Sequence, residues 1–284
     1  MTRVPRLADR ASPTVARKGP DGGWHWVPWV CELVGTAILI AGGLSAVFLD
    51  FGPGNPVASV LPSASARLLL TGLLFAGTGS LVALSPIGRV SGAHLNPAVT
   101  LAFWLRRSVH PHDLVGYVVA QLLGAFAATM LLELTWGRTA QALHLGATQP
   151  GHGLSDLAAA AVETGMTAIL VLMILLMTSS ARTARWTPLG NWLVVATLVW
   201  QGAPYTGASL NPARSLAPAV LAPELAHLWV YLVGPLAGAV LAVGVLAMLR
   251  TTGTVTAKLF HDPRYASTLA AELPTAVRHV RAMV

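Results

Sequence analysis

The sequence predicts an all-α membrane protein with six transmembrane helices and two re-entrant half-helices in an inverted repeat. Three observations support this prediction: the chain is very apolar, its apolar residues fall into six long runs, and one short segment occurs twice. Of the 284 residues, 54% are hydrophobic and only 10% are charged, and the mean hydropathy is +0.64. One water-soluble domain cannot bury so much apolar surface, so we expect the bilayer to be its solvent.

Six apolar runs have the length that a helix needs to cross hydrocarbon, about 17 to 25 residues. The runs are 29–48, 68–84, 114–136, 157–177, 187–203 and 226–249. Together with short loops they use most of the chain, which leaves no room for a soluble catalytic domain. We therefore expect residues 27–250 to form one membrane domain, with cytoplasmic tails at 1–26 and 251–284.

The basic residues predict how the chain is oriented. If the N-terminus is cytoplasmic, fifteen of the eighteen Arg and Lys residues lie inside, and only Arg67, Arg138 and Arg214 lie outside. This bias satisfies the positive-inside rule, so both termini of this multi-pass protein are predicted to be cytoplasmic, in a plasma or inner membrane. The basic residues are spread between the runs rather than along one stripe, so the net charge of +7 does not indicate a nucleic-acid partner.

The repeated segment reads GAHLNPAVT at residues 92–100 and GASLNPARS at residues 207–215. Each copy contains the triplet Asn-Pro-Ala, at Asn96, Pro97 and Ala98 and again at Asn211, Pro212 and Ala213. Asparagine can cap the free amide groups of a helix start, and proline suits the first helical position. A single Asn-Pro pair is a common helix start, but two matched copies, each followed by a short apolar stretch, predict two half-helices. At ~1.5 Å per residue, two ten-residue pieces would complete one further crossing of about 30 Å.

The repetition extends beyond this segment, because CELVGTAIL precedes the first copy and VETGMTAIL precedes the second. Each copy holds three full runs and one half-helix, with repeat 1 placed at about 29–110 and repeat 2 at about 157–250. An odd number of full crossings turns the second copy upside down relative to the first. Inverted repeats of this kind bring the broken helix ends to a cavity near the midplane, because lipid cannot satisfy free backbone groups.

With these motifs, the chain resembles the aquaporin, or major intrinsic protein, family over about residues 27–250. The resemblance implies a passive channel domain for water and small neutral solutes that excludes ions and protons. It also implies a homotetramer embedded in membrane lipid, without a cofactor or a bound metal. Two stretches of backbone carbonyl groups would form the acceptor ladder of the pore, at Gly92, Ala93 and His94 and at Gly207, Ala208 and Ser209.

The resemblance further implies a selectivity filter of Ala76, Val199, Ala208 and Arg214. Arg214 directly follows the second Asn-Pro-Ala triplet, and the other three are carried over by their spacing from the two asparagines. Because three of these side chains are apolar and small or medium in size, we expect a wide mouth. The set is similar to that of nodulin-like members, which pass glycerol, urea and neutral metalloid hydroxides. Ser215 and Ala219 instead match water channels, so a strictly water-selective aquaporin is the alternative.

Glu32 and Glu163 lie inside apolar runs, where a carboxylate is costly and usually faces protein or a cavity. Their matched places in the repeat imply that each fixes a re-entrant loop, as in the family, with a proton relay as the alternative. Inverted repeats also build ion-coupled secondary transporters, but only these two acids and Glu133 are available to bind a coupling cation. The sequence shows no nucleophile with a base and no metal-ligand spacing, and Cys31 is its single cysteine, so we do not expect an enzyme.

Overall fold

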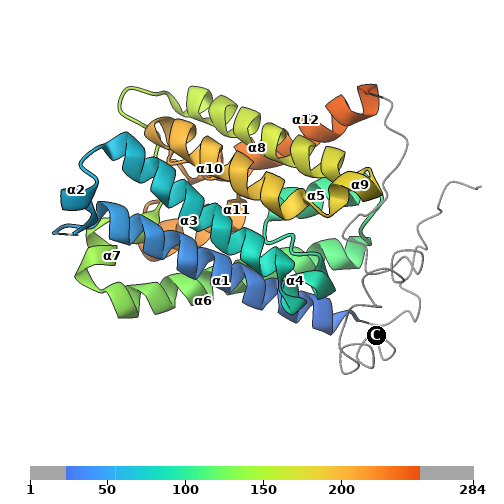
Figure 1. Cartoon of the computed structure of the whole chain (residues 1–284), viewed down its shortest axis with the longest axis horizontal. Helices are drawn as coiled ribbons and strands as arrows, with labels where there is room; N and C mark the ends of the chain where they lie inside the picture. The colour runs from blue at the N-terminus through green and yellow to red at the C-terminus, as the bar shows by residue number, and fades with distance from the viewer. Residues whose placement is uncertain (1–23, 55, 250–284) are drawn as a thin grey trace, which may run out of the picture.

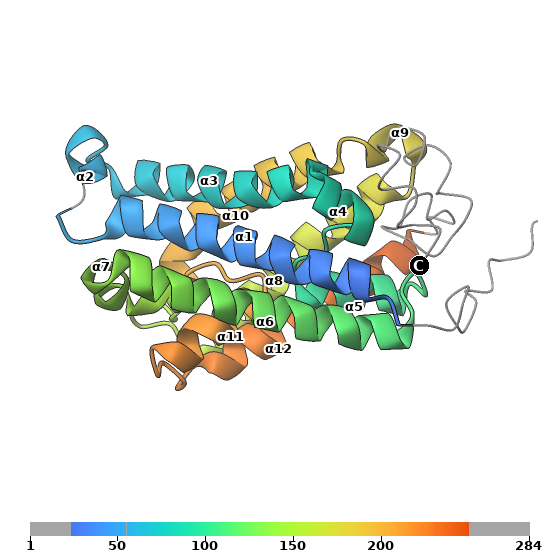
Figure 2. The same ribbon diagram turned by 90° about the horizontal axis from the view of Figure 1, so that it is seen from below.

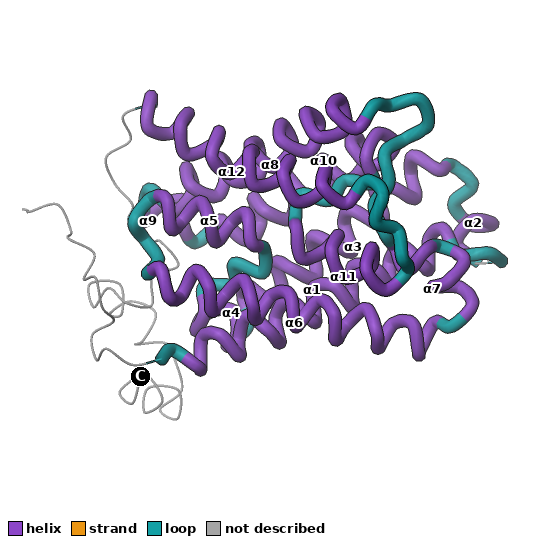
Figure 3. The backbone as a smooth tube through the Cα atoms, turned by 180° about the vertical axis from the view of Figure 1, so that it is seen from behind, coloured by secondary structure: helices purple, strands orange, loops and turns teal. Residues whose placement is uncertain are grey.

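The computed structural model describes residues 24–54 and 56–249, so nearly all of the tails predicted at 1–26 and 251–284 lies outside the described residues. Within these ranges the chain consists of helices and loops without any strand (Figures 1 and 3). The helices are α1 (Trp26–Phe51), α2 (Val57–Val60), α3 (Ala64–Leu84), α4 (Pro86–Ser91), α5 (Pro97–Leu105), α6 (Pro111–Trp136), α7 (Arg138–Ala142), η2 (His144–Gly146), α8 (Asp156–Thr178), α9 (Ala181–Ala184), α10 (Thr187–Thr206), α11 (Pro212–Leu221) and α12 (Leu228–Met248).

Among the described residues six helices are long, namely α1, α3, α6, α8, α10 and α12. They run side by side, and the short helices α5 and α11 lie among them (Figures 1 and 2). The main packed pairs are α8 with α12, α1 with α6, and α3 with α10. Five of the long helices are long and apolar enough to cross a membrane. The sixth, α10, has 20 residues and is less apolar because it carries polar residues such as Asn191 and Gln201. The predicted all-α architecture of six long helices and two half-helices is confirmed.

The two halves of the chain repeat the same order of elements. Helices α1, α3, α5 and α6 of the first half correspond to α8, α10, α11 and α12 of the second. Helix α6 packs on α1 as α12 packs on α8, so we place α6 in repeat 1, beyond the predicted end at about residue 110. Both ends of the described chain lie at the same end of the bundle (Figures 1 and 2). The assignment of that end to the cytoplasm stays a prediction.

Polar caps set the helix starts, which lie one residue (α8) and four residues (α3) before the edges of the apolar runs. Helix α3 begins at Ala64 rather than at the predicted residue 68, because the side chain of Ser63 accepts a hydrogen bond from the amide of Ala66. Ser155 caps α8 in the same way, through the amide of Ala158. A hydropathy run marks only the apolar part of a helix. The cap determines the residue at which the backbone becomes helical.

Glycine permits the close contact between α1 and α6. A Cβ atom added at Gly124 would overlap the carbonyl oxygen of Leu33, whereas a Cβ at Gly244 of α12 would meet no atom within 4 Å. We expect Gly124→Ala to destabilise the bundle by about 1–3 kcal/mol through overpacking, and Gly244→Ala to have little effect. Thermal unfolding of the detergent-solubilised variants measures the difference. Equal melting temperatures for the two variants would contradict this view of the contact.

Candidate pore and its constriction

The two half-helices begin at asparagine caps in the interior of the bundle. The side-chain Oδ1 of Asn96 accepts a hydrogen bond from the amide of Ala98 at 2.8 Å, and that of Asn211 accepts one from Ala213 at 3.0 Å. Helices α5 and α11 have nine and ten residues. At ~1.5 Å per residue they supply together roughly 28 Å of helix, close to the ~30 Å of a hydrocarbon core.

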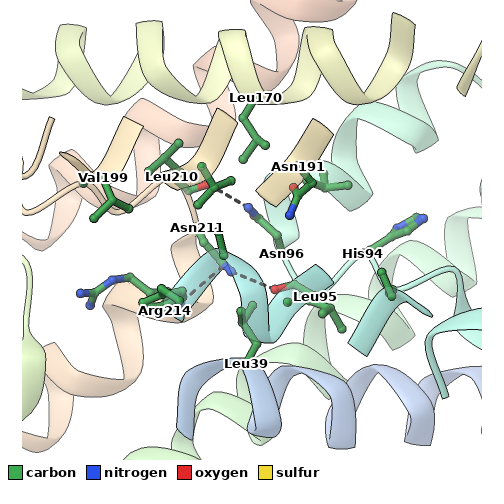
Figure 4. A pocket seen from close by; sticks show the side chains of 18 of the residues that line it. Leu39, His94, Leu95, Asn96, Leu170, Asn191, Val199, Leu210, Asn211 and Arg214 are labelled. Atoms are coloured by element: carbon green, nitrogen blue, oxygen red, sulfur yellow. Dashed lines mark hydrogen bonds between the residues drawn. The ribbon is translucent and has the colours of Figure 1, made fainter. Parts of the chain in front are cut away.

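The tips of the half-helices are joined by a reciprocal pair of hydrogen bonds. The Nδ2 group of Asn96 donates to the carbonyl oxygen of Leu210, and the Nδ2 group of Asn211 donates to that of Leu95, both at 2.8 Å (Figure 4). The amide of an asparagine carries two N–H donors, so each retains a second one beyond this bond. The crossed pair holds the two loops in register, and the repeated sequence did not predict it.

The loops that lead into the half-helices follow the same unusual backbone path in both halves. Positive φ angles occur at matched positions, namely Gly92 (87°), Ala93 (49°), Leu95 (53°), Gly207 (73°), Ala208 (49°) and Leu210 (55°). Residues other than glycine adopt this region at a cost of order 1–3 kcal/mol each. All six residues whose carbonyl groups were predicted to form the acceptor ladder line one common cavity.

Glu32 of α1 holds the first loop. Its buried carboxylate accepts hydrogen bonds from the amides of His94 and Leu95, at 2.9 and 2.7 Å, and from the Nε2 group of Gln121 at 2.8 Å. Charge-assisted bonds of this kind are worth about 1.5–3 kcal/mol each. They therefore offset the strain of the positive φ angles beside them.

Glu163 of α8 makes the equivalent contacts with the second loop. Its carboxylate accepts hydrogen bonds from the amides of Ser209 and Leu210, both at 2.9 Å, and from the hydroxyl of Thr206 at 2.7 Å. Neither Glu163 nor Glu32 is among the described residues that line the cavity. The geometry therefore favours a supporting role for both carboxylates over a proton relay along the pore.

The cavity has a volume of about 900 Å³ and extends along the interior of the bundle past both half-helix tips. The side chains predicted to form the filter, Ala76, Val199, Ala208 and Arg214, all line it. The guanidinium of Arg214 is held in place because its Nη1 donates to the carbonyl oxygen of Gly146 at 2.7 Å. Figure 4 shows Arg214 on one side of the two asparagines and His94 on the other.

Three further groups at the cavity were not predicted. The ring of Phe75 lies 5.8 Å from Cζ of Arg214, the carbonyl of Gly146 orients that arginine, and Asn191 contributes a polar side chain from α10. Phe75 is the neighbour of Ala76 in sequence, and the rotation of α3 about its axis decides whether one or both of them face the pore. In this structure both contribute to the lining.

Ser215 lies in a chain of hydroxyl groups beside the pore. Its Oγ lies 2.7 Å from Thr148 Oγ1 and 2.6 Å from Ser209 Oγ, so the hydroxyls join the η2–α8 loop to the re-entrant loop and to α11. Neither Ser215 nor Ala219 is among the described cavity-lining residues. These two water-channel markers therefore do not contact the solute path.

His94 is enclosed by protein, as expected for a loop residue. Its Nδ1 lies 3.2 Å from the hydroxyl of Thr100, and its ring packs against Phe103 and Tyr117 with centroids 4.9 and 5.1 Å apart. His94 is among the residues that line the cavity, and its imidazole packs against Phe103 of α5 and Tyr117 of α6.

A cavity that passes two opposed half-helices, inside a bundle of membrane-crossing helices, defines an integral membrane channel. Comparison with known families agrees, because the family described as Major intrinsic protein matches residues 26–246. The chain belongs to the major intrinsic protein family, and it is a passive channel for water and small solutes rather than an enzyme.

Several relatives resemble the chain over most of their length. Aquaporin NIP1-1 of Oryza sativa subsp. japonica is 33% identical over 227 residues, which cover 78% of this chain and 74% of the relative. Glycerol uptake facilitator protein-like 6 of Lactiplantibacillus plantarum is 33% identical over 221 residues, which cover 75% of this chain and 94% of the relative. The solved aquaglyceroporin of Plasmodium falciparum has the same fold, with a TM-score of 0.67, 23% identity, and coverage of 80% of this chain and 98% of that structure.

Proposed function

We propose that this channel conducts water together with small uncharged solutes, such as glycerol, urea or neutral metalloid hydroxides. The observation that carries the proposal is the cavity lining, where three apolar residues, Ala76, Val199 and Ala208, accompany the guanidinium of Arg214. An apolar wall accommodates the carbon skeleton of a polyol without a desolvation cost. Arg214 and the carbonyl ladder then supply the hydrogen bonds that the hydroxyl groups lose on leaving water.

Exclusion of ions and protons is part of the same proposal. The N-termini of α5 and α11 and the guanidinium of Arg214 place positive charge along one passage, and cations meet a barrier there. The asparagine Nδ2 groups can donate to a passing solute oxygen but cannot accept a proton from it. A neutral solute avoids this electrostatic barrier.

The alternative is a strictly water-selective pore. It was favoured by Ser215 and Ala219, but neither lines the cavity, so their identity says little about the aperture. Two relatives, a glycerol uptake facilitator-like protein and an aquaporin of the NIP group, lend further support to the wider solute range.

Permeability measurements on proteoliposomes test the proposal. Osmotic shrinkage reports water flux, and swelling in isosmotic glycerol, urea or boric acid reports solute flux. We expect faster rates than in empty vesicles for water and for at least one of the three solutes. Acceleration of water alone would establish the water-selective alternative, and uptake that depends on an imposed proton or sodium gradient would establish a coupled transporter.

Arg214→Leu is expected to preserve water flux but to increase proton leak several-fold, because the positive charge at the constriction is removed. A pH-sensitive dye inside vesicles under an imposed pH gradient measures the leak. The matched control is Arg138→Leu, which removes an exposed arginine at the start of α7 that is not part of the cavity lining. A leak that is equal in both variants would contradict the role assigned to Arg214.

We also propose that the protein forms a homotetramer in a plasma or inner membrane, with one pore in each subunit and both termini cytoplasmic. Membership of the family and the positive-inside bias support this proposal. Native mass spectrometry gives the subunit count. Protease accessibility of the termini in sealed vesicles gives the orientation.

A further inference from the structure

A cluster of two histidines and one aspartate joins the start of α1 to the start of α6. His25 precedes α1, while His112 and Asp113 lie in the first turn of α6. Sequence spacing predicted no metal site, because His25 and His112 are 87 positions apart. The fold brings one ligand atom from each of the three residues within 4.8 Å of the others.

The distances within this cluster are close to those between the ligands of a small metal ion. His25 Nδ1 lies 3.0 Å from Asp113 Oδ2 and 3.2 Å from His112 Nε2, and His112 Nε2 lies 3.5 Å from Asp113 Oδ2. Zinc binds histidine nitrogen and carboxylate oxygen at about 2.0–2.2 Å, so two ligands of a tetrahedral ion are separated by roughly 3.3–3.5 Å. The three atoms can therefore bind one ion with small adjustments of their side chains.

The surroundings hold the ligands in place. Asp113 and His25 are buried, with exposed fractions of 0% and 1%, whereas the side chain of His112 is 38% exposed and leaves a path for an ion. The indole Nε1 of Trp29 donates to Asp113 Oδ1 at 2.9 Å. That bond orients the carboxylate, as hydrogen bonds to metal ligands commonly do. Both carboxylate oxygens face His25 Nδ1, at 2.9 Å for Oδ1 and 3.0 Å for Oδ2, and Oδ2 also lies 3.5 Å from His112 Nε2.

We propose that His25, His112 and Asp113 form a binding site for a divalent late first-row transition-metal ion, with zinc as the best fit. Imidazole nitrogen with one carboxylate is a ligand set that suits such ions, whereas magnesium and calcium prefer sites made of oxygen alone. None of the three residues lines the described cavity. A bound ion therefore clamps α1 to α6, the helices that carry Glu32 and Gln121, without blocking the pore.

The opposite half of the molecule offers a matched control. Asp156 at the start of α8 accepts hydrogen bonds from His227 and Trp229 at the start of α12, at 2.7 and 3.1 Å. This pair repeats the aspartate, histidine and tryptophan of the first cluster, but it has a single histidine and is partly exposed. With only two ligands, it is not expected to retain a metal ion.

The test is equilibrium dialysis of the tag-free full-length protein in detergent against zinc chloride, followed by metal analysis and calorimetry. We expect one equivalent of zinc at this site, and we expect His112→Ala to remove that equivalent or to weaken its binding at least tenfold. His112→Ala is chosen because its side chain is partly exposed, so the variant should fold. His227→Ala should bind as the unmodified protein does.

A second measurement separates a structured site from loose adsorption. Cobalt(II) in a four-coordinate site with nitrogen and oxygen ligands should give visible absorption bands, and these should disappear in His112→Ala but not in His227→Ala.

Zinc should also raise the melting temperature of the unmodified protein more than that of His112→Ala. Failure to bind zinc, or identical binding in His112→Ala, would overturn the proposal and leave a hydrogen-bonded cluster without metal. Because the readouts are binding and stability, they do not depend on the solute that the channel conducts.

Discussion

Glycerol flux is expected to fall about tenfold or more in the double variant Ala76→Phe, Val199→His, while water flux changes far less. Both side chains line the cavity together with Arg214. A phenyl ring and an imidazole would narrow the passage and add a polar wall, so a solute with a carbon skeleton loses more room than a single file of water. Paired measurements of osmotic shrinkage and isosmotic glycerol swelling on the same vesicles give the ratio directly.

The matched control exchanges the two apolar residues, as Ala76→Val with Val199→Ala. This swap keeps the total side-chain volume and the apolar character of the lining, so glycerol flux should remain near that of the unmodified protein. Unchanged glycerol flux in the Phe and His variant would place the constriction elsewhere along the 900 Å³ cavity.

Loss of flux for every solute is the expected result of Glu163→Gln. The carboxylate accepts three hydrogen bonds, two from loop amides and one from Thr206. Glutamine offers one acceptor oxygen and turns an amide donor toward the remaining N–H groups, which leaves buried donors unsatisfied. We expect this mismatch to lower the free energy of unfolding by roughly 2–3 kcal/mol. We also expect it to displace the second re-entrant loop, which lines the pore. Vesicle permeability and thermal unfolding both measure the effect.

Glu133→Gln is the control for this prediction. Glu133 also lies on a long helix, near the end of α6, but it is partly exposed and not part of either loop contact. It should retain flux and stability. Full activity in Glu163→Gln would show that the positive φ angles of the second loop persist without the charge of Glu163.

Much of the channel could be predicted from sequence because its determinants are local or repeated. Apolar runs of membrane length marked the long helices, although the polar caps at Ser63 and Ser155 placed the starts of α3 and α8 four residues and one residue earlier. The doubled Asn-Pro-Ala triplet marked both half-helix starts, since asparagine caps and proline positions depend on only a few neighbouring residues. Hydropathy does not say which helix packs on which, so the packing of α6 on α1 could not be predicted from the apolar runs.

The sequence by itself determined the all-helical membrane architecture, the inverted repeat and the residues brought to the half-helix tips, because these follow from hydropathy and short-range backbone preferences. Only the tertiary structure decided the crossed bonds between Asn96 and Leu210 and between Asn211 and Leu95, and the carbonyl of Gly146 that orients Arg214. The tertiary structure likewise decided that His25 lies beside His112 and Asp113. These contacts join residues far apart in the chain, so they depend on helix rotation and loop path, which no local pattern encodes.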